Sequence, residues 1–230
     1  MQRKRQPEVM DQPDLDPALH AAALRGLRRI NWISRSSAIL WPAIRDLARQ
    51  HSGDSLRLLD VATGGGDIPI DLWHKARRAG FDLQVDGCDR NEYALEQARE
   101  LAKQRGADVR FFAQDALGGP LPEEYDIVVC SLFLHHFDPS DAVVILRRMG
   151  LARRLVLVND LRRGVGAWLL AWVGARILTR CRVVHIDGPL SVAGAYTCAE
   201  ARDLAREAGL TAAIVRRRWP CRWLLEWHRN

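Results

Sequence analysis

The 230-residue sequence has no long apolar run, few cysteines and very little lysine. A transmembrane helix needs about 20 apolar residues in a row, so we expect no membrane span. The first residues also lack the apolar segment of a signal peptide. The five cysteines are scattered without a Cys-x-x-Cys pair, which excludes a disulfide framework or a cysteine-based zinc site. These absences predict a protein of the reducing cytoplasm.

Basic charge gathers in the last third of the chain. Residues 1–150 carry 20 basic and 22 acidic side chains, and residues 151–230 carry 14 and 6, so the net charge goes from −2 to +8. A basic segment can bind nucleic acid or an anionic membrane surface. However, the arginines stand singly, in pairs and in one triplet, Arg216 to Arg218, without lysine-rich or aromatic-interleaved tracts. This pattern favours a solvated face and argues against a nucleic-acid partner.

Short apolar stretches alternate with helical patterns from Leu56 onward, which is typical of a mostly parallel α/β sheet with helices on both faces. Asp138-Pro139 and the capping box Thr197-x-x-Glu200 mark two of the helix starts. The expected strands are 56–62, 82–88, 108–113, 125–131, 154–159, 211–217 and 222–228. The expected helices are 67–79, 91–105, 138–148, 164–179 and 198–208.

Two more helices are expected before the first strand, after a disordered start. Asp16-Pro17 combines a capping acid with proline at the first helical position, and the second helix is expected at 36–50. Residues 1–54 therefore form a helical extension to a domain at 55–230. The extension is either a brace for the sheet or a lid that brings Asn31, Trp32 and Ile33 over a substrate.

The stretch from Leu58 to Pro69 is the most informative part of the sequence. An apolar strand ends at Asp60, passes through three glycines at 64–66 and opens into a helix. Glycine is needed where a ligand approaches the backbone closely, and it tolerates a positive φ. The spacing fits neither the Gly-x-Gly-x-x-Gly dinucleotide fingerprint nor a phosphate loop with Lys and Ser or Thr.

What remains, Asp60-x-Ala62-x-Gly64-x-Gly66, resembles the first motif of class I S-adenosylmethionine-dependent methyltransferases. Ala62 replaces the usual first glycine, and the quinone and menaquinone C-methyltransferase branch of the family tolerates alanine at this position. The second strand ends at Asp89, 23 residues after Gly66, where an acid can accept both ribose hydroxyls of an adenosine. A dehydrogenase would use this acid in the same way. Alternatively, Asp89 caps the next helix, although Asn91 can cap it alone.

Two further signals follow in the family's order. After the third strand, the resemblance implies that the acid of Asp115-Ala116 takes the adenine amino group and that the next backbone amide meets a ring nitrogen. The fourth strand leads into Leu134-His135-His136-Phe137, an ending common in the family. The resemblance implies a Rossmann-like, doubly wound sheet of seven strands with the last strand antiparallel. It assigns S-adenosylmethionine to Asp60, Ala62, Thr63, Gly64, Gly66, Asp89, Arg90, Asp115, Ala116 and Ser131.

The reaction of such a cofactor is an in-line displacement at a sulfonium methyl group, which needs position first and a deprotonated nucleophile second. A phenol with a pKa of about 10 is mostly neutral at neutral pH, so a histidine is a sensible base. The candidates are His136, His135 and His185. Asp187 is expected to assist His185 on one face of an extended segment. Each histidine is alternatively a loop residue that water or backbone satisfies.

Asn159-Asp160 follows the fifth strand and suggests a magnesium site of the catechol type. A second acid at the end of the fourth strand is missing, so we expect no metal. The stretch from Gly164 to Ala175 has no charge. It is expected to line an apolar substrate cavity, to be buried against the sheet, or to make shallow membrane contact through Arg176, Arg180 and Arg182.

The sequence therefore predicts O-methylation of a hydrophobic phenolic, polyketide or quinol small molecule. The stretch from Glu8 to Asn31 looks like family members associated with aromatic polyketide synthesis, which implies secondary metabolism. The alternatives are C-methylation of a quinone or lipid ring, a nucleic-acid methyltransferase or binder that uses the basic last third, and a non-catalytic cofactor-binding scaffold. The oligomeric state stays open.

Overall fold

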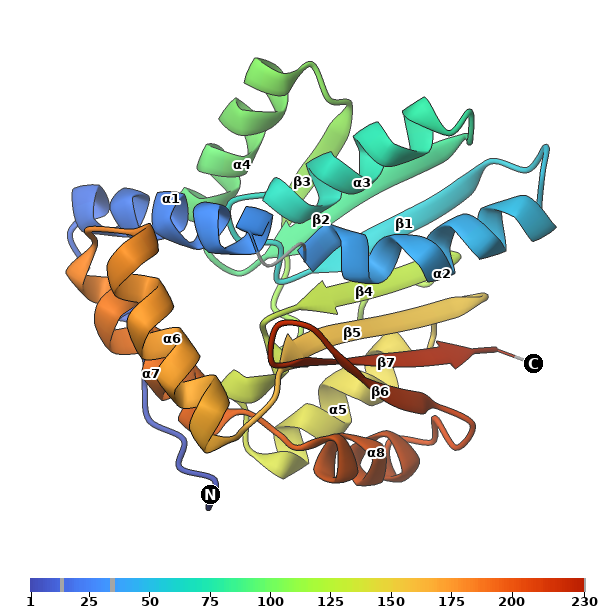
Figure 1. Cartoon of the computed structure of the whole chain (residues 1–230). Helices are drawn as coiled ribbons and strands as arrows, with labels where there is room; N and C mark the ends of the chain where they lie inside the picture. Colours follow the sequence, from blue (N-terminus) through green and yellow to red (C-terminus); the bar gives the residue numbers. More distant parts are fainter. Residues whose placement is uncertain (13–14, 34–35, 230) are drawn as a thin grey trace.

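A computed structural model describes residues 1–12, 15–33 and 36–229. Its strands are β1 (Leu56–Val61), β2 (Leu83–Asp89), β3 (Val109–Ala113), β4 (Ile127–Ser131), β5 (Leu155–Leu161), β6 (Ile214–Arg218) and β7 (Arg222–His228). In the described part of the chain they form one seven-stranded sheet in the order β3-β2-β1-β4-β5-β7-β6 (Figure 1). β7 runs antiparallel to both of its neighbours, and the other pairs are parallel. The predicted Rossmann-like sheet with an antiparallel last strand is confirmed.

Helices cover both faces of this sheet. On one face, α2 (Ser36–Gln50) and α3 (Asp67–Arg78) pack against strand side chains such as Leu58. On the other face, α5 (Pro139–Met149) and α8 (Cys198–Glu207) pack against a second set of strand side chains. α4 (Glu92–Arg105) packs beside α3 and over β3. Because β4 is buried on both faces, its sequence is a continuous apolar run.

The expected element boundaries differ from the observed ones mostly by one or two residues. The largest difference is β6, which was expected from residue 211 and begins at Ile214. The intervening residues form a turn after α8, in which the Ala213 amide donates to the Leu210 carbonyl at 3.0 Å. α1 (Pro17–Ile33) and α2 lie where the sequence predicts them. The side chains of Asn31, Trp32 and Ile33 lie outside the described part of the structure, so their expected role over the substrate stays a prediction.

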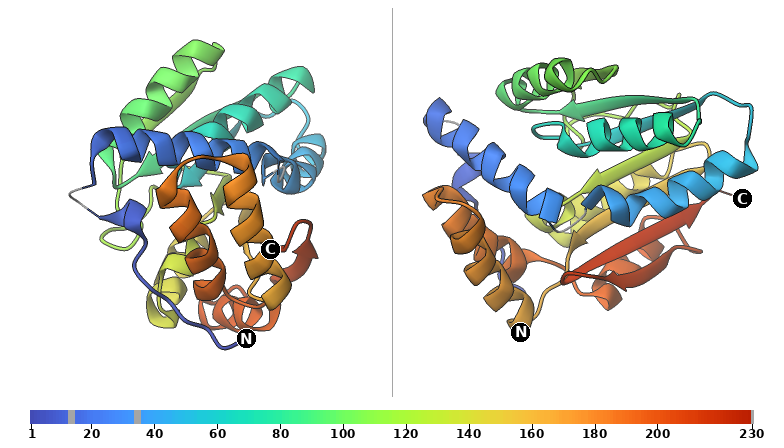
Figure 2. Two further views of the ribbon diagram at one scale, coloured as in Figure 1. Left: turned by 60° about the vertical axis from the view of Figure 1, so that its left-hand side comes forward. Right: turned by 45° about the horizontal axis from the view of Figure 1, so that its top comes forward.

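A helical hairpin of α6 (Val165–Leu178) and α7 (Arg182–Gly194) is inserted between β5 and α8. It stands beyond the carboxyl ends of the parallel strands, with α1 lying across it (Figure 2). The expected extended segment around His185 is wrong, because those residues belong to α7. Val183 and Val184 favour strands by propensity, but their burial in a cluster with Ala23 of α1 stabilises a helix.

The side chains of α6 are largely exposed, so one of the three alternatives for this helix, burial against the sheet, is wrong. Val165 is 73% and Ile177 is 76% exposed, and of this helix only Ala167 and Ala175 are buried. α6 packs against α1 and α7 rather than against the sheet, which explains why this apolar helix has an exposed side. Among the described residues, no helix combines the length and apolar character of a membrane span.

The first residues form an arm along α7, so the expected disordered start is wrong. The Lys4 amide donates to the Ala193 carbonyl at 2.9 Å, and Arg3 Nε donates to the Gly194 carbonyl at 2.7 Å. Arg5 binds Asp138 through two hydrogen bonds of 2.9 Å. Asp138 is the N-cap residue of α5 but makes no side-chain capping bond there, because its carboxylate is engaged by the arm.

Candidate active site

The glycine turn after β1 adopts left-handed backbone conformations. Gly64 and Gly66 have φ values of 53° and 75°. A Cβ on Gly66 would lie 2.7 Å from the Ala98 Cβ, whereas one on Gly64 would meet nothing within 4 Å. Packing against α4 therefore requires glycine at 66, and the backbone at 64 is left bare. Ala62 has a φ of 56° and holds a conformation that costs alanine energy.

Asp60 lies under this turn and is almost fully buried. Its Oδ2 accepts a hydrogen bond of 2.7 Å from the Thr63 hydroxyl. Burial raises the pKa of Asp60 to about 8; the Thr63 hydrogen bond opposes the shift, and the charges of Asp67 and Asp89 add to it. Asp60 therefore keeps its proton at neutral pH, and the negative charges that act on this turn are those of Asp67 and Asp89.

Asp89 ties the end of β2 to the glycine turn. Its Oδ2 accepts from the Gly64 amide at 2.8 Å, and its Oδ1 accepts from the Asn91 amide at 2.9 Å. Asn91 caps α4 with its own side chain by accepting from the Ala94 amide at 3.2 Å, so the helix does not depend on Asp89. The adjacent Arg90 is exposed.

The other residues assigned to the cofactor lie at neighbouring strand ends. Asp115 is exposed, and its Oδ1 accepts from the Leu117 amide at 2.9 Å, which closes a turn after β3. Ala116 is buried beside it, and its carbonyl accepts from Arg148 at 2.7 Å. Ser131 is buried at the end of β4, with Asn159 Nδ2 at 3.4 Å from its hydroxyl.

α1 lies over the glycine turn. A Cβ on Gly65 would be 3.8 Å from Leu24 Cδ2, and the rings of His20 and Tyr93 have centroids 5.3 Å apart. Further along α1, Gly26 lets the helix approach α7, since a Cβ there would lie 3.1 Å from Val184. α1 therefore bridges the glycine turn and the α6–α7 hairpin.

Two histidines stand beyond β4, in the short helix η2 (Leu134–His136). His135 is buried, with its Nδ1 2.6 Å from Asp160 Oδ1 and its Nε2 3.6 Å from Glu8 Oε1. Burial by itself would lower the pKa of His135, but the charges of Asp160 and Glu8 outweigh it and raise the pKa to about 10.

His136 is the more open of the two histidines. Its side chain is 22% exposed, and its Nδ1 lies 3.9 Å from Glu8 Oε1. The centroid of the His136 ring lies 4.2 Å from that of His135 and 6.4 Å from that of Phe133. The histidine pair therefore has one buried and one accessible member.

His185 does not join this cluster in the expected way. Its Nε2 lies 2.8 Å from the Thr179 carbonyl, in the turn between α6 and α7. The carboxylate of Asp187 accepts from the Val9 and Met10 amides at 2.9 and 3.0 Å. The expected help of Asp187 to His185 is wrong, because residues two apart on a helix point in different directions.

Sequence reasoning missed Glu8, which the arm brings against both histidines. The residue is separated from them by more than a hundred positions, so no spacing pattern could have placed it there. Asn159, which the sequence suggested with Asp160 as part of a magnesium site, has a fully buried side chain, and its Oδ1 has no hydrogen-bond partner among the described residues.

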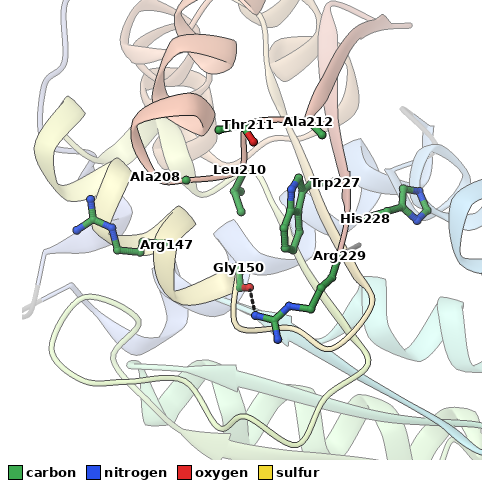
Figure 3. Close-up of a pocket in the computed structure, with 10 residues that line it drawn as sticks. Arg147, Gly150, Ala208, Leu210, Thr211, Ala212, Trp227, His228 and Arg229 are labelled. Atoms are coloured by element: carbon green, nitrogen blue, oxygen red, sulfur yellow. Dashed lines mark hydrogen bonds between the residues drawn. The ribbon is translucent and has the colours of Figure 1, made fainter.

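A surface hollow of about 370 Å³ lies elsewhere on the molecule (Figure 3). Arg147, Leu210 and Trp227 line it, and Arg229 donates to the Gly150 carbonyl at 3.1 Å beside it. These residues lie where β7 ends and α5 and α8 end, which is the edge opposite to the glycine turn. Ligands of open parallel sheets bind beyond the carboxyl ends of the strands, so the hollow is not part of the site.

Comparison with known proteins points to one chemistry. A family model described as a methyltransferase domain matches residues 58–153. The ubiquinone biosynthesis O-methyltransferase of Methylococcus capsulatus is 33% identical over 127 residues, which are 54% of this chain and 51% of that protein. The protein of the same name from Thiobacillus denitrificans is 31% identical over 157 residues, 67% of this chain and 64% of its own length. The chain thus spans less than two thirds of these curated relatives.

Solved structures share the fold. The magnesium protoporphyrin IX methyltransferase of Synechocystis PCC 6803, bound to S-adenosylhomocysteine, has a TM-score of 0.59 at 20% identity, covering 85% of this chain and 84% of that one. An O-methyltransferase from neocarzinostatin biosynthesis, in complex with S-adenosylmethionine and 2-hydroxy-5-methyl naphthoic acid, has a TM-score of 0.63 at 21% identity. The match covers 92% of this chain and 57% of that one.

Proposed function

We propose that this chain, in which residues 58–153 match a family model described as a methyltransferase domain, transfers the methyl group of S-adenosylmethionine to a hydroxyl group of a hydrophobic small molecule. The observation that carries this proposal is the bare, left-handed turn at Gly64 together with the acid Asp89 at the end of the next strand. A sulfonium cofactor needs both a close backbone approach and an acceptor for its ribose.

The acids around the glycine turn suit a cationic cofactor. The negative charges of Asp67 and Asp89 both act on Asp60 there, and a sulfonium brings the opposite charge. The demethylated product is a neutral thioether at the same position. We therefore expect the methylated form to gain more from this field than the product, which favours product release.

The acceptor side lies beyond β4 and β5, where the histidine cluster stands. A phenol has a pKa of about 10, so its hydroxyl must lose a proton before it attacks the methyl group. We propose that the cluster of Glu8, His135 and His136 promotes the loss of this proton. Attack then occurs in line with the bond from sulfur to the methyl carbon, and position provides most of the rate.

The acceptor class follows from the relatives. The curated relatives are ubiquinone O-methyltransferases, and the neocarzinostatin enzyme was crystallised with naphthoic acids. Both point to a hydroxyl on an aromatic or quinol ring. Phe133 beside His136 offers an apolar surface for such a ring.

The bridge that α1 forms over the glycine turn supports the proposal that the N-terminal extension is a lid.

Calorimetric titration with S-adenosylhomocysteine tests the cofactor site. Asp89→Ala is expected to weaken binding roughly ten- to hundred-fold, because a charged hydrogen-bond acceptor is lost. Asp82→Ala is the matched control, since Asp82 is an exposed acid just before the same strand. Absence of binding by the unmodified protein would refute the proposal.

Methyl transfer from labelled S-adenosylmethionine to dihydroxylated aromatic probes tests the reaction. We expect the label on oxygen, which nuclear magnetic resonance of the product identifies. A label on ring carbon would instead favour the alternative of C-methylation.

A further inference from the structure

We propose that Glu8, His135 and His136 bind one divalent transition-metal ion, for which zinc is the best fit. One ligand atom from each of these side chains can be chosen so that all three lie within 4.8 Å of one another. Two imidazole nitrogens with one carboxylate oxygen form a ligand set that zinc uses in catalytic sites. The sequence predicted no metal because a second acid was missing beyond β4, and Glu8 supplies that acid from the arm.

The distances within the cluster suit a shared ion better than direct hydrogen bonds. Glu8 Oε1 lies 3.6 Å from His135 Nε2 and 3.9 Å from His136 Nδ1, beyond the usual length of a hydrogen bond. Ligand atoms about 2.1 Å from a tetrahedral centre are roughly 3.4 Å apart. Small side-chain rotations would therefore bring all three atoms to bonding distance of one ion.

Surrounding groups orient the ligands. Asp160 Oδ1 lies 2.6 Å from His135 Nδ1, so the proton of the neutral ring is held on Nδ1 and the lone pair on Nε2 is directed toward Glu8. This is the carboxylate–histidine–metal arrangement common in zinc proteins. The Ser191 hydroxyl donates to Glu8 Oε1, which fixes the carboxylate in turn.

The charges of the cluster call for a dication. Glu8 and Asp160 are two buried carboxylates on either side of His135. Arg5 binds Asp138, and Arg3 donates to the carbonyls of Gly194 and Phe137, whereas the buried Arg222 acts electrostatically on Asp160. A divalent ion bound to a neutral His135 would take over the role of the ring proton in offsetting the charges of Glu8 and Asp160.

Three protein ligands leave at least one position of the ion open. If the proposed function holds, this position takes the acceptor oxygen. The O–H bond breaks, its proton leaves to solvent water, and the oxygen binds the ion as an oxyanion. Its electron pair then forms the new bond to the methyl carbon while the bond from carbon to sulfur breaks, and the sulfur keeps that pair as a neutral thioether. In this scheme His136 is a ligand rather than a base.

Cobalt(II) titration of the chelator-treated full chain tests the site, because visible absorption reports the ligand geometry of cobalt. We expect one tightly bound ion per chain with the spectrum of a four- or five-coordinate site. Glu8→Gln and His136→Gln are each expected to weaken binding about ten-fold or more. His185→Ala is the matched control and should bind as the unmodified protein does, since His185 bonds the Thr179 carbonyl.

Failure of the unmodified protein to bind one cobalt ion would overturn the proposal. Cobalt binding by Glu8→Gln and His136→Gln that is as tight as that of the unmodified protein would also overturn it, once circular dichroism shows that both variants are folded. Methyl transfer by metal-free protein would remove the ion from the reaction and leave the proposed function standing. Conversely, cobalt binding without uptake of S-adenosylhomocysteine would support the metal site and refute the proposed function.

Discussion

The carboxylate of Asp160 binds both the ring Nδ1 and the backbone amide of His135. The ring Nδ1 lies 2.6 Å from Oδ1, and the backbone amide donates to Oδ2 at 3.0 Å. Both residues are buried, and they come from the ends of the adjacent strands β4 and β5. This bidentate contact fixes the ring and the backbone of the short helix η2 together.

Removal of this carboxylate should therefore destabilise the fold. Asp160→Ala leaves His135 with an unpaired ring N–H in the interior, and we expect a loss of about 3 kcal/mol in the free energy of unfolding. Asp160→Asn keeps an oxygen that can accept one of the two hydrogen bonds, so its free energy of unfolding should fall by less. Urea unfolding curves measure both; an unchanged midpoint for Asp160→Ala would contradict the account.

Gly66 and Gly80 form a matched pair for testing the turn. Both have a φ of 75°, but a Cβ on Gly66 would lie 2.7 Å from Ala98, whereas one on Gly80 would meet nothing within 4 Å. Gly80→Ala should cost about 1 kcal/mol from backbone strain alone. Gly66→Ala adds a steric clash and should cost roughly 2 to 4 kcal/mol. Thermal or urea unfolding compares them, and equal losses would show that the contact with α4 is unimportant.

The pKa of Asp60, raised by burial to about 8, predicts a pH dependence of stability. Between the ordinary pKa of an aspartate and pH 8, the folded state keeps a proton that the unfolded state has released. The free energy of unfolding should therefore fall as pH rises through this range, by at most about 1.4 kcal/mol per pH unit from this group. Asp60→Asn should flatten the dependence of the urea midpoint on pH. A profile identical to that of the unmodified protein would exclude Asp60 as its source.

The two accessible histidines should differ in their effect on turnover. His136→Ala removes a member of the cluster that activates the acceptor, and we expect kcat to fall roughly 100-fold or more with little change in cofactor affinity. His185→Ala should stay close to the unmodified protein, because His185 bonds a backbone carbonyl between α6 and α7. Steady-state rates and cofactor titrations of both variants check this. Full activity of His136→Ala would remove this residue from the mechanism.

The fold and the contact between the glycine turn and Asp89 were predictable because their signals are local. The turn at residues 60–66 sits on one strand–turn–helix unit, and Asp89 follows the next strand, so alternation of elements brings both to the same edge of the sheet. Helix starts were predictable for the same reason: the capping box of Thr197 with Glu200 is confirmed.

The cluster of Glu8, His135 and His136 depends on long-range packing. Glu8 meets His135 only because the arm bonds along α7, and Asp187 is used for that docking rather than for His185. α7 itself is a helix despite its β-branched residues, since burial against α1 outweighs local propensity. Local sequence thus determined which strands form and where a glycine turn leaves the backbone bare. Which side chains meet beyond those strands depended on contacts between distant segments, whose energies no local pattern contains.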